Sequence, residues 1–353
     1  MERHKNEVQR RLHGICDLRA FKPFDPAVHA PLIEQSKDDR FHISSAAIAL
    51  YCNGFTRKAV HDARFGYLYN DEKRGLQAAF GVFRRFDSKN YVVAMPLKGG
   101  LLAAENAIDD SGLWDLPSIT GTYVRFLDVD DYIEALRGGS LPAKEHPWDP
   151  NAPEEDETLC NSRVDLSKLR LNARTGFNRA QHFLERNGIM LRFEQLTESE
   201  LSTAYEIVRG HFELLENGGK RVSSTPEDYL GLLQPEIINL EAVTARIGFL
   251  NGLPVSVFIA EKTGPKTVGM YSTIVVRDMK YLTERLGINA EDEEKKRGMS
   301  AIPAFMLLSY LKRLRESGME TVYLGGSEIA ELNKAKIQLG AENDPTYWVV
   351  KMR

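Results

Sequence analysis

VGMYSTIVV (Val268–Val276) is rich in β-branched and aromatic residues, and this composition predicts a buried strand. Further along, IPAFMLLSYLKRLRESG (Ile302–Gly318) repeats apolar residues at helical spacing, with Pro303 in the first turn, where a missing N–H costs nothing. ETVYLGG (Glu320–Gly326) is again strand-like. A strand, a crossover helix and a second strand form a parallel pair with a right-handed connection. This unit decides the fold of the chain.

A charged segment, EEKKRGMSA (Glu293–Ala301), precedes the predicted crossover helix. The N-terminus of that helix lies at the carboxyl end of the first strand, where its free N–H groups and its dipole favour an anion or a carbonyl group. We therefore expect a loop that holds a phosphate, a carbonyl or a nucleic-acid end, in which Gly298 lets the backbone approach the ligand. The alternative is a solvated, flexible loop. The candidate binding residues are Lys295, Lys296, Arg297, Gly298 and Ser300.

The length of 353 residues suits two domains. Four prolines and an acidic cluster in LPAKEHPWDPNAPEEDE (Leu141–Glu157) indicate an exposed linker. We predict a first domain over 1–145, a linker over 146–164 and a second domain over 165–353. The apolar content of 42% and the charged content of 27% are ordinary for a soluble globular protein.

Charge, cysteine content and hydropathy limit the function classes. The net charge of −4 argues against a generally basic DNA-binding protein but permits a local basic face. The three scattered cysteines predict a reducing compartment and no zinc site or disulfide framework. The charged N-terminal segment has no signal-peptide pattern, and no run approaches the ~20 apolar residues of a membrane span. We expect a cytoplasmic protein without transmembrane association, and no metal site.

The order of predicted elements gives a fold class. The first domain shows four strands, at 65–69, 76–85, 90–96 and 121–127, and a short helix at 130–137. Gly99-Gly100 suits a turn better than a phosphate loop, because the lysine and hydroxyl of a Walker loop are missing. The second domain shows helices at 165–188 and 197–215, a strand at 189–195, a hairpin at 241–262 around Asn251-Gly252, and a last strand at 347–351. We predict an α/β (α+β) fold with a mixed central sheet flanked by helices.

A family resemblance rests on the C-terminal motifs. YLGGS (Tyr323–Ser327), LNKAK (Leu332–Lys336) and LGA (Leu339–Ala341) resemble the Fem-type branch of the GNAT superfamily, which includes the lysyl-phosphatidylglycerol synthase catalytic domain. Ala335 and Leu339 depart from this pattern, in which the family has Phe. The resemblance implies tandem GNAT-like domains with a degenerate N-terminal copy. It also implies that Lys336 stabilises the charge that develops on an aminoacyl carbonyl oxygen.

The candidate residues fall into two groups. For catalysis we select Lys336 by resemblance, Tyr271, Ser272 and Tyr323 as guides for the proton or the acceptor, and Glu261 as a candidate base. For binding of substrate or tRNA, the remaining candidates besides the charged segment are Lys312, Arg313, Arg315, Arg174, Arg179, Gly325, Gly326 and Asn333. Arginine suits phosphate contacts, although a solvated helix face is an alternative for Arg174 and Arg179.

The resemblance implies an aminoacyl-tRNA-dependent transferase that forms an amide bond on a small molecule or cell-wall precursor, for example in antibiotic or other natural-product biosynthesis. Charged tRNA would be the co-substrate and partner, with no permanently bound cofactor. An acyl-CoA-dependent N-acyltransferase is the first alternative, and a non-catalytic GNAT-like binding protein is the second.

Overall fold

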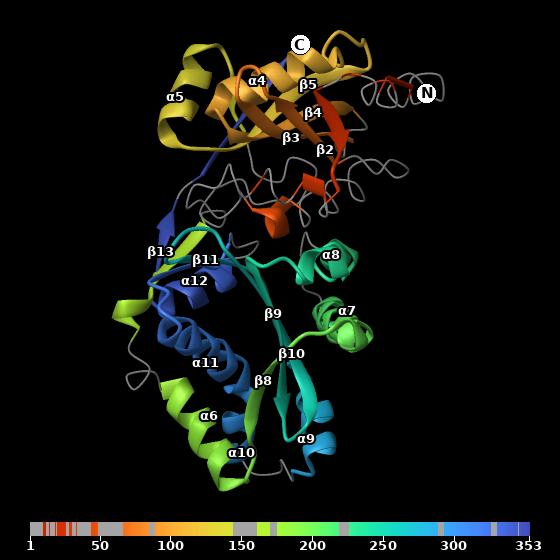
Figure 1. The fold of residues 1–353 in the computed structure, drawn as a ribbon. Helices are drawn as coiled ribbons and strands as arrows, with labels where there is room; N and C mark the ends of the chain where they lie inside the picture. The colour runs from red at the N-terminus through yellow and green to blue at the C-terminus, as the bar shows by residue number, and fades with distance from the viewer. Residues whose placement is uncertain are drawn as a thin grey trace. The chain divides into compact units, whose positions relative to one another are not determined.

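The chain folds into two compact units, each built on its own seven-stranded sheet within the part that is described (Figure 1). The computed structural model describes residues 10, 11, 14, 18, 20–25, 28, 29, 33, 44–48, 66–84, 89–143, 161–169, 175–218, 226–288, 293–325, 330–344 and 346–353. The first unit takes the described residues up to Asn161 and then Asp344–Arg353, and the second takes Ser162–Gly325 and Glu331–Asn343. The predicted linker at 146–164 lies largely outside the described residues.

The first sheet has the order β1-β2-β3-β4-β5-β14-β6. Its strands β4 and β5 are parallel and are joined through helix α4 (Gly100–Ser111), while the other described pairs are antiparallel. Helix α5 (Val129–Arg137) follows β5. The strands are β1 (Phe21–Pro23), β2 (Tyr67–Asp71), β3 (Leu76–Arg84), β4 (Asn90–Lys98), β5 (Ile119–Leu127), β6 (Leu141–Pro142) and β14 (Tyr347–Met352).

The second sheet has the order β13-β7-β12-β11-β10-β9-β8. As predicted, β11 and β12 are parallel and are joined by a crossover that contains α11. The strands are β7 (Asn161–Asp165), β8 (Leu191–Gln195), β9 (Val243–Leu250), β10 (Leu253–Lys262), β11 (Thr267–Val275), β12 (Thr321–Tyr323) and β13 (Ala341–Asp344). The α-helices are α6 (Thr175–Arg186), α7 (Leu201–Asn217), α8 (Pro235–Ile238), α9 (Met279–Leu286), α10 (Glu293–Ser300), α11 (Ile302–Glu316) and α12 (Ala330–Gln338). Short 3-10 turns lie at Leu166–Lys168, Glu198–Glu200 and Pro226–Leu230.

Helices cover both faces of the second sheet, with α6 and α11 on one side and α7 and α8 on the other (Figure 1). The apolar stripe of α11 is buried as its sequence predicts, and it packs with α6 and with β10 and β11 in one core. The buried residues of α11 are Ile302, Phe305, Met306, Leu308, Tyr310, Leu311 and Leu314. The mixed α/β class and the mixed sheets of the prediction are confirmed.

Local signals in the sequence specify two turns of the second unit. The backbone N–H of Thr197 donates to Glu200 Oε2 at 3.0 Å, which is half of the predicted capping box ahead of α7. Asn251 and Gly252 both have positive φ, 48° and 82°, as the tight turn between β9 and β10 requires.

The charged segment before α11 is a helix and not the predicted loop. Residues 293–300 form α10, which packs against α6. A Cβ atom at Gly298 would lie 2.6 Å from Cγ of Phe183, so this glycine permits close helix packing. The expectation that Gly298 lets a ligand approach the backbone is therefore wrong.

Two other element predictions are corrected. The helix predicted over 165–188 begins only at Thr175, since residues 161–165 form β7 beside β12. The last strand, β14, does not close the second sheet. It pairs with β5 and β6 of the first sheet, so the end of the chain completes the first unit.

Candidate active site

The parallel strands β11 and β12 diverge in the second unit. Their pairing ends at Gly269 and Tyr323, whereas β11 continues beside β10 as far as Val275. We call this last pair, Gly269 and Tyr323, the apex. Beyond the apex, one side of β11 has no β12 partner. Thr273 is the one exposed residue of β11, and it lies in the stretch beyond the apex. Beyond the apex, Thr273 is therefore the part of β11 that reaches solvent.

Tyr271 and Ser272 lie on β11 just beyond the apex. Ser272 pairs with Ile259 and Met270 pairs with Ala260, so Tyr271 is the extra residue of a β-bulge. Both predicted side chains are buried, and the Ser272 hydroxyl donates to the Val257 carbonyl at 3.1 Å. Because this hydroxyl is used within the sheet, Ser272 supports the strand in the structure.

Lys336 projects from α12 to the end of β12. Its ammonium group donates to the carbonyl oxygens of Leu324 at 2.9 Å and Gly325 at 3.0 Å, and only 8% of the residue is exposed. Gly325 has a φ of +69°, a conformation that favours glycine. The strand end and the glycine thus hold a buried cation next to the apex.

Glu261 and Tyr323 lie in the row of register partners across the sheet at which the pairing of β11 with β12 ends. Glu261 pairs with Gly269 on β10, and Gly269 pairs with Tyr323 on β12. Glu261 is fully buried, and Tyr323 is 9% exposed. The structure therefore brings both predicted residues to the apex at which Lys336 binds the carbonyls that follow Tyr323.

A basic hollow of about 520 Å³ lies on the crossover between β11 and α11. Two helices form it: α9 contributes Lys280 and α10 contributes Lys296 and Arg297. Two hydroxyl groups and a thioether complete the lining. The full set is Met279, Lys280, Thr283, Lys296, Arg297 and Ser300, and we call it the basic hollow. Two of the three cations are ion-paired on their own helices, Lys280 with Glu284 at 4.0 Å and Lys296 with Glu293 at 3.1 Å.

The other predicted cations are not part of the basic hollow. Lys295 lies on α10 but does not line it. Lys312, Arg313 and Arg315 lie ten or more residues beyond Ile302, the first residue of α11, which corresponds to roughly 15 Å of helix. Arg315 donates to the Leu169 carbonyl at 3.1 Å. Arg179 is exposed on α6, Asn333 lies on α12 with its side chain outside the description, and Arg174 and Gly326 lie outside the described residues.

Sequence reasoning missed α9 and its contribution to the basic hollow. Two signals were present: the Asp278 carboxylate accepts from the Tyr281 N–H at 3.0 Å, and Gly287 ends the helix with a φ of 65°. An aspartate before and a glycine after eight residues are ordinary helix boundaries. Read together, they would have predicted a helix that contains Lys280.

His211 on α7 is a titratable group on the other side of the sheet. Burial, and then the positive charge of Arg277, lower the pKa of His211 to about 4. Its Nδ1 atom is buried and has no hydrogen-bond partner within the described part of the chain. The imidazole is therefore neutral at pH 7.

The corresponding helix start in the first unit already holds an anion. Gly99 and Gly100 have positive φ, 92° and 56°, ahead of α4. The Asp131 carboxylate accepts from the Leu101 N–H at 3.0 Å, and a Cβ atom at Gly100 would lie 2.6 Å from it. The helix N-terminus is thus satisfied by the chain itself.

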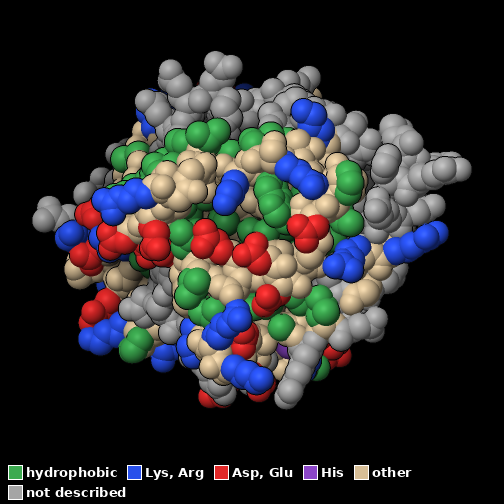
Figure 2. All heavy atoms as spheres, turned by 90° about the horizontal axis from the view of Figure 1, so that it is seen from above, with side chains coloured by type: hydrophobic (Ala, Val, Ile, Leu, Met, Phe, Trp, Pro, Cys, Tyr) green, Lys and Arg blue, Asp and Glu red, His purple; other side chains and the backbone are tan. Residues whose placement is uncertain are grey.

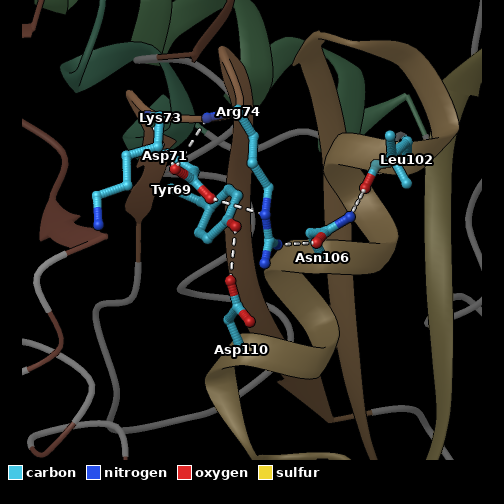
Figure 3. Close-up of polar contacts among 7 residues, drawn as sticks. All are labelled: Tyr69, Asp71, Lys73, Arg74, Leu102, Asn106 and Asp110. Carbon is cyan, nitrogen blue, oxygen red and sulfur yellow. Dashed lines mark hydrogen bonds and ion pairs between the residues drawn. The ribbon is translucent and has the colours of Figure 1, made fainter.

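Polar side chains of the first unit fasten the β2–β3 turn to α4 (Figure 3). The Tyr69 hydroxyl donates to Asp110 at 2.6 Å, and Arg74 donates to Asn106. Burial and the bond to Asp110 raise the pKa of Tyr69. On the molecular face in Figure 2, Lys and Arg side chains are interspersed with Asp and Glu.

No known protein-family model matches the chain, and no curated protein matches it. Solved structures do match. A conserved protein of unknown function from Bacteroides thetaiotaomicron superposes with a TM-score of 0.59 at 11% identity, covering 94% of this chain and 99% of that one. L-PGS from Bacillus licheniformis gives 0.55 at 10% identity, with coverages of 91% and 90%. FemX gives 0.55 at 10% identity, with coverages of 94% and 97%.

These likenesses extend over both units of the chain. At such low identity they establish the fold, which is the fold of FemX and L-PGS. The fold that the resemblance predicted is thereby confirmed. Among the described residues, no helix is long and apolar enough to cross a membrane, and no group of three or more His, Cys, Asp or Glu side chains is placed to bind a metal ion.

Proposed function

We propose that the protein is an aminoacyl-tRNA-dependent transferase that joins an amino acid to the amine, or another nucleophile, of a small-molecule or cell-wall-type acceptor. The observation that carries this proposal is the position of Lys336. Its ammonium group is nine-tenths buried and lies at the end of β12, where β12 and β11 diverge. The fold shared with FemX and L-PGS agrees with this choice.

Amide formation from an ester needs a polarised carbonyl, a deprotonated amine and close placement of the two. We assign the aminoacyl carbonyl to the divergence, against the backbone N–H groups of β11 beyond Gly269. Lys336 then stabilises the negative charge that develops on the carbonyl oxygen, because a fixed cation in a buried site acts strongly on a nearby charge.

We assign the phosphates near the tRNA acceptor end to the basic hollow. Lys280, Lys296 and Arg297 surround one concavity beside the crossover that leads into α11. An acyl-CoA-dependent N-acyltransferase is the second candidate, and the same hollow favours it, because a pyrophosphate is also a compact polyanion next to a helix start.

One binding experiment separates the two candidates. Binding of bulk charged tRNA and of acetyl-CoA is measured side by side across a salt series, with the wild type and with a variant in which Lys280, Lys296 and Arg297 are changed to Gln. We expect salt-dependent tRNA binding, and a fall in the slope of log K against log salt of about 0.7 to 0.9 for each phosphate contact removed. Changing the exposed Arg192, Arg209 and Lys266 to Gln is the matched control, which removes equal charge elsewhere on the second unit.

A turnover measurement then tests Lys336. The K336M variant should lose about 10²- to 10³-fold in kcat for consumption of bulk charged tRNA, the usual cost of removing one donor to an oxyanion. Tight acetyl-CoA binding without tRNA binding would reject the tRNA-dependent reaction in favour of the acyl-CoA enzyme. Undiminished turnover by K336M would remove the assigned role of the lysine.

A further inference from the structure

Two nitrogen-bearing side chains near the end of β11 take no part in the proposed reaction. Arg277 is the second residue after β11, and His211 lies near the C-terminal end of α7, the helix that packs against β10 and β11. The positive charge of Arg277 contributes to the lowered pKa of His211, so the guanidinium lies near the imidazole. The free stretch of β11 beyond the apex thus leads to a place where these two groups come together.

The guanidinium of Arg277 is a cation without a counter-charge in the described part of the chain. Burial lowers its pKa, and no neighbouring carboxylate among those residues raises it again. The adjacent acid, Asp278, instead caps α9, where its carboxylate accepts from the Tyr281 N–H at 3.0 Å. Removing a charge from water is costly unless an opposite charge comes with it. The place is therefore suited to an anion that a ligand brings.

His211 presents a hydrogen-bond donor next to this cation. Its Nδ1 atom is buried and has no hydrogen-bond partner within the described part of the chain. The neutral ring carries one proton, and a buried N–H group without an acceptor is costly, so the proton is favoured on Nε2. Because the residue is half-buried with Nδ1 inside, Nε2 is the nitrogen that faces outward. The ring therefore offers an Nε2–H group beside Arg277.

The basic hollow begins two residues further along the chain. Met279 and Lys280 line it, and three residues of backbone reach at most about 11 Å, so Arg277 lies close to it. Arg277 is exposed as a residue, so a ligand can reach it from solvent. Unlike Lys280, which pairs with Glu284 at 4.0 Å, Arg277 forms no ion pair with a described residue. Two neighbouring cationic places suit an extended polyanion better than a single small anion.

We propose that Arg277 and His211 bind a backbone phosphate of the tRNA acceptor strand, next to the phosphates that occupy the basic hollow. This inference rests on the proposed function and deepens it. The planar guanidinium donates two parallel hydrogen bonds to the free oxygens of a phosphodiester, and the Nε2–H group donates to one of them. Since the free stretch of β11 separates Arg277 from the apex at Gly269, both residues orient the tRNA without touching the reacting carbonyl.

Binding of bulk tRNA across a salt series tests the charge of Arg277. R277Q should weaken binding about tenfold at low salt and reduce the slope of log K against log salt by about 0.7 to 0.9, the loss of one phosphate contact. R277K keeps the charge without the planar fork, so it should restore the slope. R192Q is the matched control, because Arg192 is an exposed arginine on β8, at the far edge of the same sheet. A slope in R277Q equal to that in R192Q would overturn the site.

The donor is tested separately from the charge. H211F removes the Nε2–H group without changing the net charge, so it should weaken tRNA binding about 2- to 10-fold with an unchanged salt slope. H211Q places an amide N–H near the same position and should bind tRNA more tightly than H211F. Because both residues bind one phosphate, the double variant of R277Q and H211F should cost less than the product of the two single losses. Equal tRNA affinity of H211F and the wild type would overturn the assignment of His211.

Direct observation of the imidazole shows whether the ligand reaches it. The histidines of the full-length protein are labelled with a nitrogen isotope, and the imidazole resonances that disappear in H211Q are assigned to His211. At pH 7, bulk tRNA should shift these resonances in the wild type but not in R277Q. Coenzyme A and inorganic pyrophosphate are added in parallel, since their phosphate oxygens offer the same chemistry from another source.

Failure of this site and failure of the proposed function give different results. If the wild type does not bind tRNA, the proposed function is wrong and the assignment to a tRNA phosphate falls with it. A His211 shift with coenzyme A alone would then move the phosphate site to the acyl-CoA enzyme, and no shift with any of the three ligands overturns the site itself. If the wild type binds tRNA with the expected salt dependence while His211 does not shift, the transferase stands and this phosphate site is overturned.

Discussion

One carboxylate distinguishes the starts of the two crossover helices. In the first unit the Asp131 side chain accepts a hydrogen bond from the first turn of α4, so the helix N-terminus already has its anion. In the second unit α11 begins at Ile302, its N-cap residue Ala301 makes no side-chain cap, and Lys296 and Arg297 line the hollow just ahead of it. A helix start attracts negative charge. At the scale of single residues, the first unit satisfies this attraction with its own carboxylate, whereas the start of α11 has no side-chain cap.

His211 makes stability depend on pH. Its pKa in the folded protein is about 4, below the ordinary value of 6.5, because burial and the charge of Arg277 disfavour the protonated form. As the pH falls below 6.5, the unfolded chain takes up a proton that the folded chain does not accept until about pH 4. The free energy of unfolding should therefore fall across this window, by up to about 3 kcal/mol from this group.

The measurement is urea unfolding at pH values between 4 and 7. H211Q should lose less stability than the wild type over this range, since it removes the depressed group. H182Q, at an exposed histidine of α6, is the control and should follow the wild type. Equal pH dependence of H211Q and the wild type would contradict the assignment.

At the scale of elements, α10 was predicted as a loop because the helix packing that accompanies its helical structure involves residues far away in the sequence. Its sequence, EEKKRGMS, is highly charged and contains a glycine, which is the usual composition of a solvated loop. What makes it helical is the contact of Gly298 with Phe183, which lies more than a hundred positions earlier in the chain. No local pattern contains that partner. The capping box at Thr197 and the turn at Asn251 were predicted because each is complete within a few residues.

Alanine at two helical glycines should have opposite effects. G298A should destabilise the second unit by about 1 to 3 kcal/mol, because the new methyl group overlaps Phe183 in the contact between α6 and α10. G210A should stabilise it by up to about 1 kcal/mol, because a Cβ atom on α7 meets nothing within 4 Å and alanine favours a helix. Urea midpoints of the two variants against the wild type provide the check, and effects of the same sign would refute the packing argument.

At the scale of the whole molecule, the sequence predicted the strands more reliably than the sheet to which they belong. YWVVK was expected at the end of the second sheet because it follows that sheet in the chain. In the structure β14 lies between β5 and β6, and Trp348 and Val349 are buried in the first unit. Alternating apolar residues specify that a segment is a strand, but not its neighbours. Likewise, the sequence selected Glu261, Tyr323 and Lys336 separately, and only the sheet register shows that they share one apex.

The crossing of the chain back to the first unit gives a prediction about truncation. Removing residues 344–353 should leave β5 without its antiparallel neighbour and β6 without a sheet, so the first unit should lose stability although the deletion is at the far end of the sequence. Hydrogen exchange resolved by peptide is the measurement. Amides of β4 and β5 should exchange faster in the truncated chain, while those of β9 and β10 keep their protection. The V350A variant, which shortens one buried side chain of β14, should act in the same direction with a smaller effect. Faster exchange confined to β9 and β10 would show that the end of the chain stabilises the second unit instead.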